Sequence, residues 1–281
     1  MRGARPERAL DAVVRRVLRP DPGACVVVAC SGGPDSVALA ALLDRLARED
    51  GYEIVLAHVD HGRRASAAQD ECVVLSVAAR LGRPVRVLRP FVERDDEATM
   101  REARYAALAT LAAELNAPLV ATAHTAEDQA ETVLLALFRG TGPAGLAGMP
   151  PVRPLAGSVD LIRPVLRATR AQLAVELRRS ALPCAIDPSN EDRRYRRNAL
   201  RPMLAELRRE FPHLDAAIAR CAEIVRDELE GNALAARRRG VREHLRREGK
   251  LRDASFADID AQAAVALPVD PFAQDQQPGL K

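Results

Sequence analysis

The sequence lacks paired cysteines. Its five cysteines are scattered, odd in number and never spaced as CxxC; they stand at positions 25, 30, 72, 184 and 221. This pattern argues against a disulfide framework, a zinc ribbon or a cysteine-ligated cluster. Cys25 and Cys30 flank an apolar run, so we expect both to behave as small buried hydrophobic residues. No feature that would stabilise a thiolate is visible, which disfavours a cysteine nucleophile.

Long apolar runs are also missing. No uninterrupted stretch approaches the roughly 18 residues that a membrane span needs. The first eight residues, MRGARPER, are charged and lead into an amphipathic segment without the apolar core of a signal peptide. We therefore expect a cytoplasmic protein with no membrane partner. With 48% hydrophobic residues among 281, the chain can form one sizeable core and a smaller second module.

Lysine is nearly absent, since only Lys250 and Lys281 occur, and arginine carries the positive charge. The formal net charge is only +3, but it is unevenly distributed. Residues 161–211 hold twelve Arg against six Asp and Glu, and residues 231–252 hold eight Lys and Arg against two Glu. Such basic blocks favour a polyanionic partner such as nucleic acid. A solvated helical surface explains them equally well.

Short β-branched runs alternate with segments of helical periodicity. Strands are predicted at 24–30, 54–59, 85–88, 119–122 and 161–162. Helices are predicted at 36–48, 66–81, 98–115, 126–138, 169–180 and 194–210, with Thr169 as a cap. The alternation predicts an α/β fold with a doubly wound parallel sheet. Ligands bind such sheets at the carboxyl ends of the strands, where the polar segments 31–36, 58–64 and 122–128 fall.

The order of these segments predicts three parts. Residues 1–211 form the expected catalytic domain, and residues 212–268 form a small C-terminal helical module. Residues 269–281 are expected to be a disordered tail. The Gly-rich stretch 139–145 is expected to be a flexible loop.

The segment Ser31-Gly32-Gly33-Pro34-Asp35-Ser36 stands between a predicted strand and a predicted helix. Its glycines let the backbone approach phosphate oxygens, and the helix start directs N–H groups and a positive dipole end at them. A carboxylate beside phosphates would repel them, so Asp35 suggests Mg²⁺ coordination. No Gly-Lys-Ser/Thr follows, so this is not a Walker loop. The alternative is a tight turn with a capping Ser or Asp.

A second polar segment begins at the end of the next predicted strand and contains His58, Asp60, His61, Arg63 and Arg64. These side chains could contact the phosphates of a nucleotide or a second cation. His58 and Asp60 share one face of an extended strand, but a pair without a third ligand is weak evidence for zinc. A polar loop at a strand end is the alternative.

A third segment places His124, Asp128 and Glu131 at i, i+4 and i+7, which predicts one stripe of a helix. Two carboxylates on that stripe could hold an ammonium-bearing substrate by charge-assisted hydrogen bonds. Thr125 with Asp128 also fits a capping-box-like pattern, a purely structural explanation that leaves Glu131 unaccounted for.

A fourth segment combines turn-forming residues at 187–192 with a basic helix start. Arg197 and Arg201 stand one helical turn apart. They could stabilise a developing phosphoryl charge or contact an RNA backbone.

The first segment resembles the SGGxDS loop of the N-type ATP pyrophosphatases, which cut ATP between the α and β phosphates. Seven segments in order across about 31–201 resemble the tRNA(Ile)-lysidine synthase family. They read SGGPDS, HVDHGRR, REARY, HTAEDQAET, RGTGPAGLAGM, RP and DPSNEDRRYRRNALR. Arg63 departs from the pattern, because the family usually has Leu there.

The resemblance implies ATP with Mg²⁺, the isoleucine tRNA with a CAU anticodon, and free L-lysine. In the family, O2 of the wobble cytidine is adenylated and the lysine ε-amino group then attacks C2, releasing AMP. It implies that Ser31–Ser36 hold ATP with Asp35 near Mg²⁺, and that Asp128 and Glu131 bind the lysine amines. His124 and Arg197 would lie near the phosphates and the reacting base.

Rival functions remain open. A tRNA 2-thiolation enzyme would share the loop but need reactive or cluster-binding cysteines. An ammonia-using synthetase would not need the basic blocks. A non-enzymatic adenine-nucleotide-binding protein would need neither Asp128 nor Glu131. The sequence leaves the oligomeric state open, with a homodimer as one option.

Overall fold

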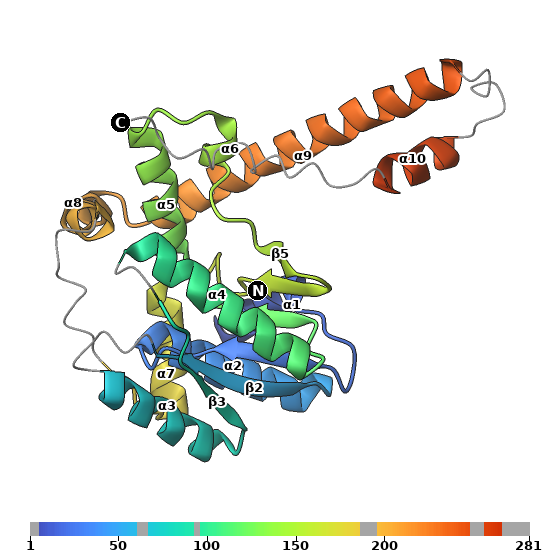
Figure 1. Ribbon diagram of the computed structural model, residues 1–281. Helices are drawn as coiled ribbons and strands as arrows, with labels where there is room; N and C mark the ends of the chain where they lie inside the picture. Colours follow the sequence, from blue (N-terminus) through green and yellow to red (C-terminus); the bar gives the residue numbers. More distant parts are fainter. Residues whose placement is uncertain (1–5, 61–66, 93–95, 186–195, 248–255, 266–281) are drawn as a thin grey trace, which may run out of the picture. The chain divides into compact units, whose positions relative to one another are not determined.

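The computed structural model describes residues 6–60, 67–92, 96–185, 196–247 and 256–265 (Figure 1). The chain divides into two compact units, one of residues 1–131 with 149–216 and one of residues 132–148 with 217–281. The predicted boundary at residue 211 remains a prediction, and the predicted tail at 269–281 lies outside the described residues. Within the described part, no helix combines the length and the apolar character of a membrane span.

Unit 1 contains a six-stranded sheet in the order β3-β2-β1-β4-β6-β5. The strands are β1 (Cys25–Ala29), β2 (Glu53–Val59), β3 (Val85–Leu88), β4 (Leu119–Ala121), β5 (Val152–Ala156) and β6 (Val159–Ile162). All neighbours pair in parallel except β5, which is antiparallel to β6. The predicted doubly wound α/β fold is confirmed.

The strand β5 was not predicted. Its residues alternate between exposed and half-buried, and Pro154 stands in its middle, so no apolar run marks it. Proline is tolerated in edge strands, and β5 is an edge strand. A tight turn at Gly157, whose φ is +54°, connects β5 to β6.

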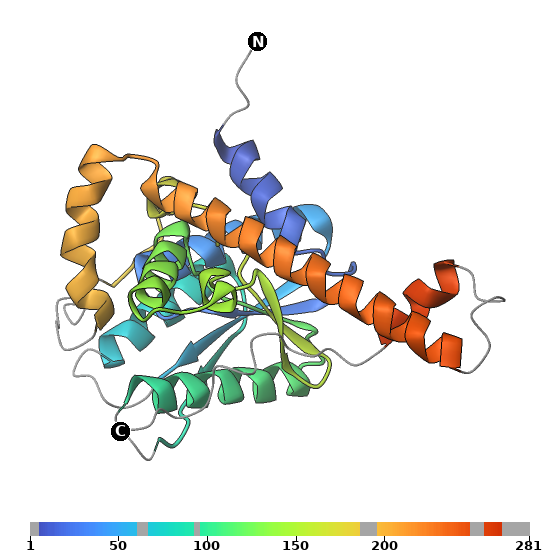
Figure 2. The ribbon, with the colours of Figure 1, turned by 90° about the horizontal axis from the view of Figure 1, so that it is seen from above.

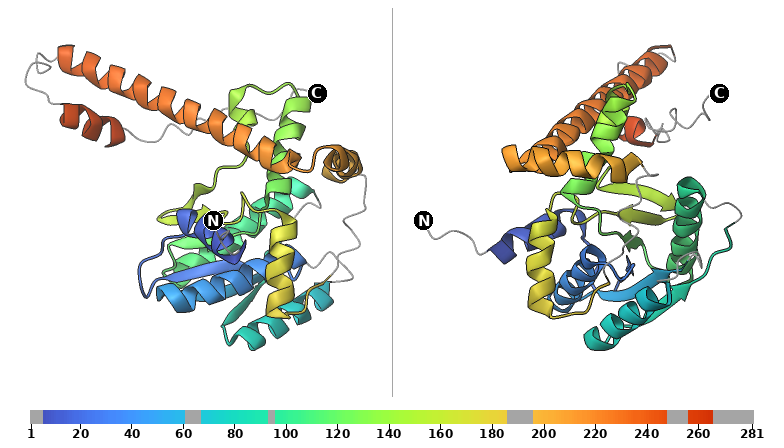
Figure 3. Two further views of the ribbon diagram at one scale, coloured as in Figure 1. Left: turned by 180° about the vertical axis from the view of Figure 1, so that it is seen from behind. Right: turned by 90° about the vertical axis from the view of Figure 1, so that its left-hand side faces the viewer.

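The sheet has helices on both faces. The helices of unit 1 are α1 (Pro6–Val17), α2 (Pro34–Asp50), α3 (Ala67–Leu81), α4 (Glu97–Glu114), α7 (Arg170–Ser180), α8 (Arg196–Glu210) and the start of α5 (Ala126–Phe138). Helices α1, α2, α3 and α7 cover one face of the sheet and α4 covers the other (Figures 2 and 3). Each group of helices contributes buried side chains to the core on its face. In β1, Val26 and Val28 enter the first core and Val27 the second, which explains the unbroken apolar run.

Unit 2 is helical. It contains the end of α5, the short α6 (Pro143–Leu146), most of α9 (Leu214–Arg247) and α10 (Phe256–Val265). The stretch expected to be a flexible loop therefore includes one helical turn, which Gly142 caps and Pro143 begins. Arg226 of α9 donates a hydrogen bond to the Ala147 carbonyl. Arg238 of α9 pairs with Asp260 of α10 at 2.7 Å.

Gly32 meets two requirements at the end of β1. Its φ is +88°, a left-handed conformation that other residues adopt at a cost. A Cβ there would also lie 3.1 Å from the backbone oxygen of Asp70 in α3. The glycine therefore allows the loop after β1 to pass close to α3.

We predict that Gly32→Ala lowers the free energy of unfolding more than Gly82→Ala does. Gly82 has a φ of +66° but open space around its Cβ position. Both variants therefore lose about 1–2 kcal/mol from backbone strain, and only Gly32→Ala adds about 1 kcal/mol or more from crowding. Urea unfolding of the two variants measures the difference. Equal losses would contradict the close approach to α3.

Candidate active site

The site lies where the winding of the sheet reverses. From β1 the chain proceeds to β2 and β3 on one side, and it returns to β4 and β6 on the other. The loops that follow β1 and β4 therefore meet at the carboxyl edge, where doubly wound sheets bind ligands. The predicted placement of segments 31–36 and 122–128 at strand ends is confirmed.

The loop after β1 is a compact turn held by its own serines. The Ser31 N–H donates to Ser36 Oγ at 3.1 Å, and Ser36 Oγ donates to the Gly33 carbonyl at 2.9 Å. Gly33 is the N-cap of α2, with Pro34 at its first position. No Ser or Asp side chain caps this helix. The N–H groups of its first turn are therefore available to an anionic group bound beside the loop.

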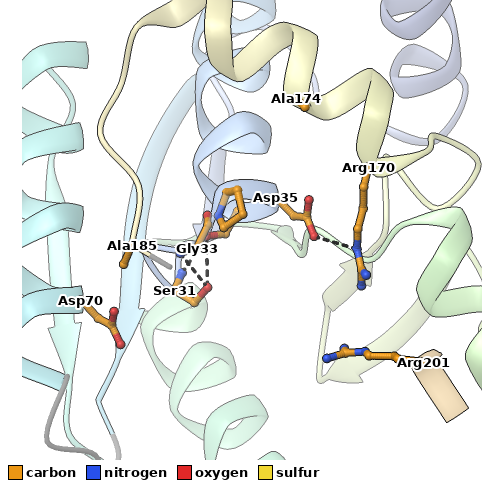
Figure 4. Close-up of a pocket in the computed structure, with 10 residues that line it drawn as sticks. Ser31, Gly33, Asp35, Asp70, Arg170, Ala174, Ala185 and Arg201 are labelled. Atoms are coloured by element: carbon orange, nitrogen blue, oxygen red, sulfur yellow. Dashed lines mark hydrogen bonds and ion pairs between the residues drawn. The ribbon is translucent and has the colours of Figure 1, made fainter. Parts of the chain in front are cut away.

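A cavity of about 590 Å³ opens beside this loop (Figure 4). Its lining includes Ser31, Asp35, Ser36, Asp70, Arg170 and Arg201. Figure 4 shows Asp35 and Arg170 facing each other, with Arg201 across from the loop. Hydroxyl, carboxylate and guanidinium groups thus surround one space at a helix start.

Arg170 connects the segment after β1 with the segment after β4. Its Nε lies 3.2 Å from Asp35 Oδ2, and its Nη2 donates to Asp128 Oδ1 at 2.8 Å. Its backbone N–H donates to both carboxylate oxygens of Glu127, at 2.9 and 3.1 Å. Sequence reasoning missed this arginine, because its partners stand 42 and more residues away. The only local signal is its position directly after the helix cap Thr169, whose predicted capping is confirmed.

The pKa values of the two carboxylates shift in opposite directions. Burial raises the pKa of Asp35, and Arg170 offsets this only in part. Burial also acts to raise the pKa of Asp128, but Arg170 and the Thr125 N–H outweigh it, so the net shift is downward. Asp128 therefore holds its charge more firmly than Asp35 does.

The segment after β4 is partly as predicted. Asp128 Oδ2 accepts from the Thr125 N–H at 2.9 Å and from Thr125 Oγ1 at 3.1 Å, so the expected capping pattern is present. Because this cap starts α5 at Ala126, His124 precedes the helix and the single helical stripe is wrong for it. Thr122 Oγ1 donates to the Ile162 carbonyl and lies 3.0 Å from His124 Nδ1. With the hydroxyl proton of Thr122 on the Ile162 carbonyl, Nδ1 is the donor of this pair, and in that tautomer of the neutral ring Nε2 carries the lone pair.

Glu131 has a partner that the sequence did not reveal. Its side chain is only 1% exposed, and its Oε1 lies 3.0 Å from Arg201 Nε. Arg201 also lines the cavity, so Glu131 is connected to it through this arginine. The backbone of Arg197 belongs to α8, but its side chain lies outside what the structure describes.

The polar segment at the end of β2 begins within the strand itself, at His58. His58 is buried, and its Nδ1 donates to the Cys30 carbonyl at 3.0 Å. Asp60 lies 3.7 Å from Arg89, measured between Oδ2 and Nε. Neither residue is among those that line the cavity. His61, with Arg63 and Arg64, lies outside the described residues.

The sequence matches the family model of a PP-loop domain over residues 6–207. It is 40% identical over 270 residues to the tRNA(Ile)-lysidine synthase of Salinispora arenicola, covering 94% of this chain and 73% of that protein. The chain belongs to the tRNA(Ile)-lysidine synthase family. The family member from Ralstonia nicotianae is 45% identical over 203 residues, which cover 70% of this chain and 44% of that protein. The chain thus spans less than half of one relative and about three quarters of the other.

A solved structure supports the fold of this lysidine synthase family member. The U34-tRNA thiolase NcsA from Methanococcus maripaludis, solved with its [4Fe-4S] cluster, superimposes with a TM-score of 0.63. The match covers 78% of each chain at 17% identity, so it shows a shared fold alone. In this family member all five cysteines are free, and the described residues contain no group of three potential metal ligands.

We predict that Arg170→Met destabilises this lysidine synthase family member by about 1–3 kcal/mol, because Asp35 and Asp128 lose their shared counter-charge. The Arg170 side chain is 37% exposed, so the loss stays below that of a fully buried pair. Urea unfolding measures it. Adding Asp128→Asn to Arg170→Met should cost less than the two single losses summed.

The matched control is Arg178→Met, at an exposed position of the same helix. It should change the free energy of unfolding by less than about 0.5 kcal/mol. Strict additivity of Arg170→Met and Asp128→Asn would contradict the coupling of the two side chains.

Proposed function

We propose that the chain is a ligase that joins L-lysine to C2 of the wobble cytidine in the isoleucine tRNA with a CAU anticodon. The reaction consumes ATP, passes through an adenylated tRNA, and releases AMP and pyrophosphate. One observation carries the proposal: the loop carboxylate of Asp35 and the carboxylate of Asp128 meet on one guanidinium. The loop that suits a nucleotide and the carboxylate that suits an amine thus lie in one site.

The proposed reaction has two steps. Cytidine O2 attacks the α phosphate of ATP, the bond to the β phosphate breaks, and pyrophosphate leaves. The lysine ε-amino group then attacks C2, the C–O bond breaks, AMP leaves, and the amine loses a proton. Adenylation converts a poor leaving oxygen into a good one. We propose that His124 accepts the proton that the amine loses. Its Nε2 carries the lone pair when Nδ1 donates to Thr122.

In this proposal Ser31–Ser36 bind the phosphate groups of ATP. His58, Asp60 and His61 are proposed as further contacts to the nucleotide. The cavity beside the loop and the uncapped start of α2 support the first part. Arg197 is proposed to lie near the reacting base. Mg²⁺ is often held by one or two carboxylates together with substrate phosphates, and Asp35 in the cavity lining fits that role. A bound Mg²⁺ would neutralise phosphate charge during AMP transfer.

Lysine recognition is proposed for Asp128 and Glu131. The lowered pKa of Asp128, in which Arg170 and Thr125 outweigh burial, keeps it ionised for an ammonium group. Glu131 is paired with Arg201, so an amine at Glu131 would share the carboxylate with that arginine. The basic stretches 161–211 and 231–252 are proposed to contact the tRNA, in a cytoplasmic enzyme whose oligomeric state we leave open.

Thiolation is the weaker alternative. Cys30, beside the loop, is buried, and burial raises the pKa of its thiol. A raised pKa disfavours the thiolate that sulfur chemistry needs. None of the described cysteines stands in a group that could hold a metal cluster.

The decisive experiment incubates the protein with ATP, Mg²⁺, labelled lysine and transcripts of CAU-anticodon isoleucine and methionine tRNA. Label should enter the isoleucine tRNA alone, and Asp35→Ala should abolish pyrophosphate release. Label in no RNA would refute the ligase proposal. Pyrophosphate release at the normal rate from Asp35→Ala would show that the loop role is wrong.

A second test separates the two steps. Asp128→Asn keeps an acceptor for the Thr125 cap but removes the charge. We predict that lysine transfer falls by about 100-fold or more, since a charge-assisted hydrogen bond to the amine is removed, whereas tRNA-dependent AMP transfer falls much less. Rapid-quench measurement of each step checks this, with Asp21→Asn, at an exposed position before β1, as the matched control. Equal loss of both steps would make Asp128 a nucleotide or structural residue.

A further inference from the structure

A second cluster of arginines surrounds Tyr105, a residue of α4. The Arg101 guanidinium carbon lies 5.5 Å from the centroid of the Tyr105 ring, and that of Arg153 lies 4.9 Å from it. Arg163, directly after β6, interacts with the Tyr105 hydroxyl group. The helix α4 and the hairpin of β5 and β6, which is distant from α4 in the sequence, thus bring three positive charges to one phenol.

The cluster lacks a carboxylate within the described part of the chain. Arg101 contacts the Tyr105 ring and has no ion pair with a described residue. Arg153 donates only to the neighbouring Pro154 carbonyl, at 3.1 Å. In contrast, Arg170 and Arg201 of the cavity each face a carboxylate. Like charges held together without a counter-ion destabilise a fold unless an anion joins them.

Arg163 is the buried member of this cluster of positive charges. Its side chain is 1% exposed, and its Nη1 donates to the Pro150 carbonyl at 2.6 Å, while its Nε has no hydrogen-bond partner among the described residues. Burial, with Arg153 and Arg101 nearby, lowers the pKa of Arg163 to about 10. Burial would raise the pKa of Tyr105, but the three arginines together lower it. The shift at Tyr105 reports a positive local potential, whereas the shift at Arg163 reports its burial first and its neighbouring arginines second.

The cluster is separate from the nucleotide cavity. None of its four residues is among those that line the cavity. Tyr105 belongs to α4 and Arg153 to the edge strand β5. Figure 1 shows α4 passing beside β5, and the two elements are in contact. The cavity residues Arg170 and Ala174 belong to α7, whose core lies on the other face.

We propose that Arg101, Arg153, Arg163 and Tyr105 form an anion site that takes a backbone phosphate of the tRNA. A guanidinium stacked on an aromatic ring keeps its in-plane N–H donors available, and their fork matches phosphate oxygens. Arg101 and Arg153 are half-exposed, so a phosphate on the surface can reach them, while Arg163 adds charge from below. The inference rests on the proposed function, because it takes tRNA as the source of the phosphate.

The test measures tRNA binding by the full chain at several salt concentrations. The double variant Arg101→Gln with Arg153→Gln should weaken binding about tenfold and reduce the salt slope by about one for each phosphate that the variant no longer neutralises. Arg153→Lys should keep most of the slope, because it keeps the charge. The affinity for Mg²⁺-ATP without tRNA should stay unchanged, and the melting temperature shows that the variant is folded.

The matched control is Arg86→Gln. Arg86 is exposed on β3, the opposite edge strand, and its one hydrogen bond among the described residues goes to the Val85 carbonyl. It should leave tRNA affinity and slope as in the parent. A double variant with parental affinity and slope would overturn the inference. So would a loss of ATP affinity with unchanged tRNA binding, which would assign the cluster to the nucleotide. If the parent protein binds no tRNA, the proposed function itself fails.

Discussion

The Arg170 guanidinium is the interaction on which the arrangement of the site depends. Asp35 and Asp128 would repel each other at the carboxyl edge of the sheet, and one cation between them removes that penalty. The start of α7 is held in turn by Glu127, and the Ala126 N–H donates to the Ala168 carbonyl at 2.9 Å. The packing of α7 against α2 completes the frame. A helix remote in sequence from the loop after β1 is therefore part of the proposed nucleotide site.

Much of this could be predicted from periodicity and spacing. Buried parallel strands are short apolar runs, so β1 to β4 and the helices between them are visible in the sequence. The strand β5 is not, because an exposed edge with Pro154 has no apolar signature. The partners of Arg170 and Glu131 could not be predicted, since every pair joins residues 42 or more positions apart. Only the folded sheet brings these residues together.

Several arginines of the basic block at 161–211 pair with carboxylates inside the fold. Arg170 and Arg201 neutralise carboxylates of the site, and Arg208 pairs with Asp215 at 2.7 Å. Arg163 is buried. Part of the formal excess is therefore used inside the protein, and the charge that a polyanion would meet is smaller than the count suggests. Conversely, Arg101 and Arg153 stand outside the block, yet carry charge without a described carboxylate partner.

The edge strand β5 also bears on how the sheet ends. An open strand edge can accept a strand from another molecule, and natural sheets prevent this with prolines, charges and irregular pairing. In β5, Pro154 has no N–H to offer, Arg153 adds charge, and the ladder with β6 is irregular between Pro154 and Ala156. These features disfavour the addition of a strand from a neighbouring copy at this edge. An arginine that protects against aggregation can at the same time serve as a contact for a ligand.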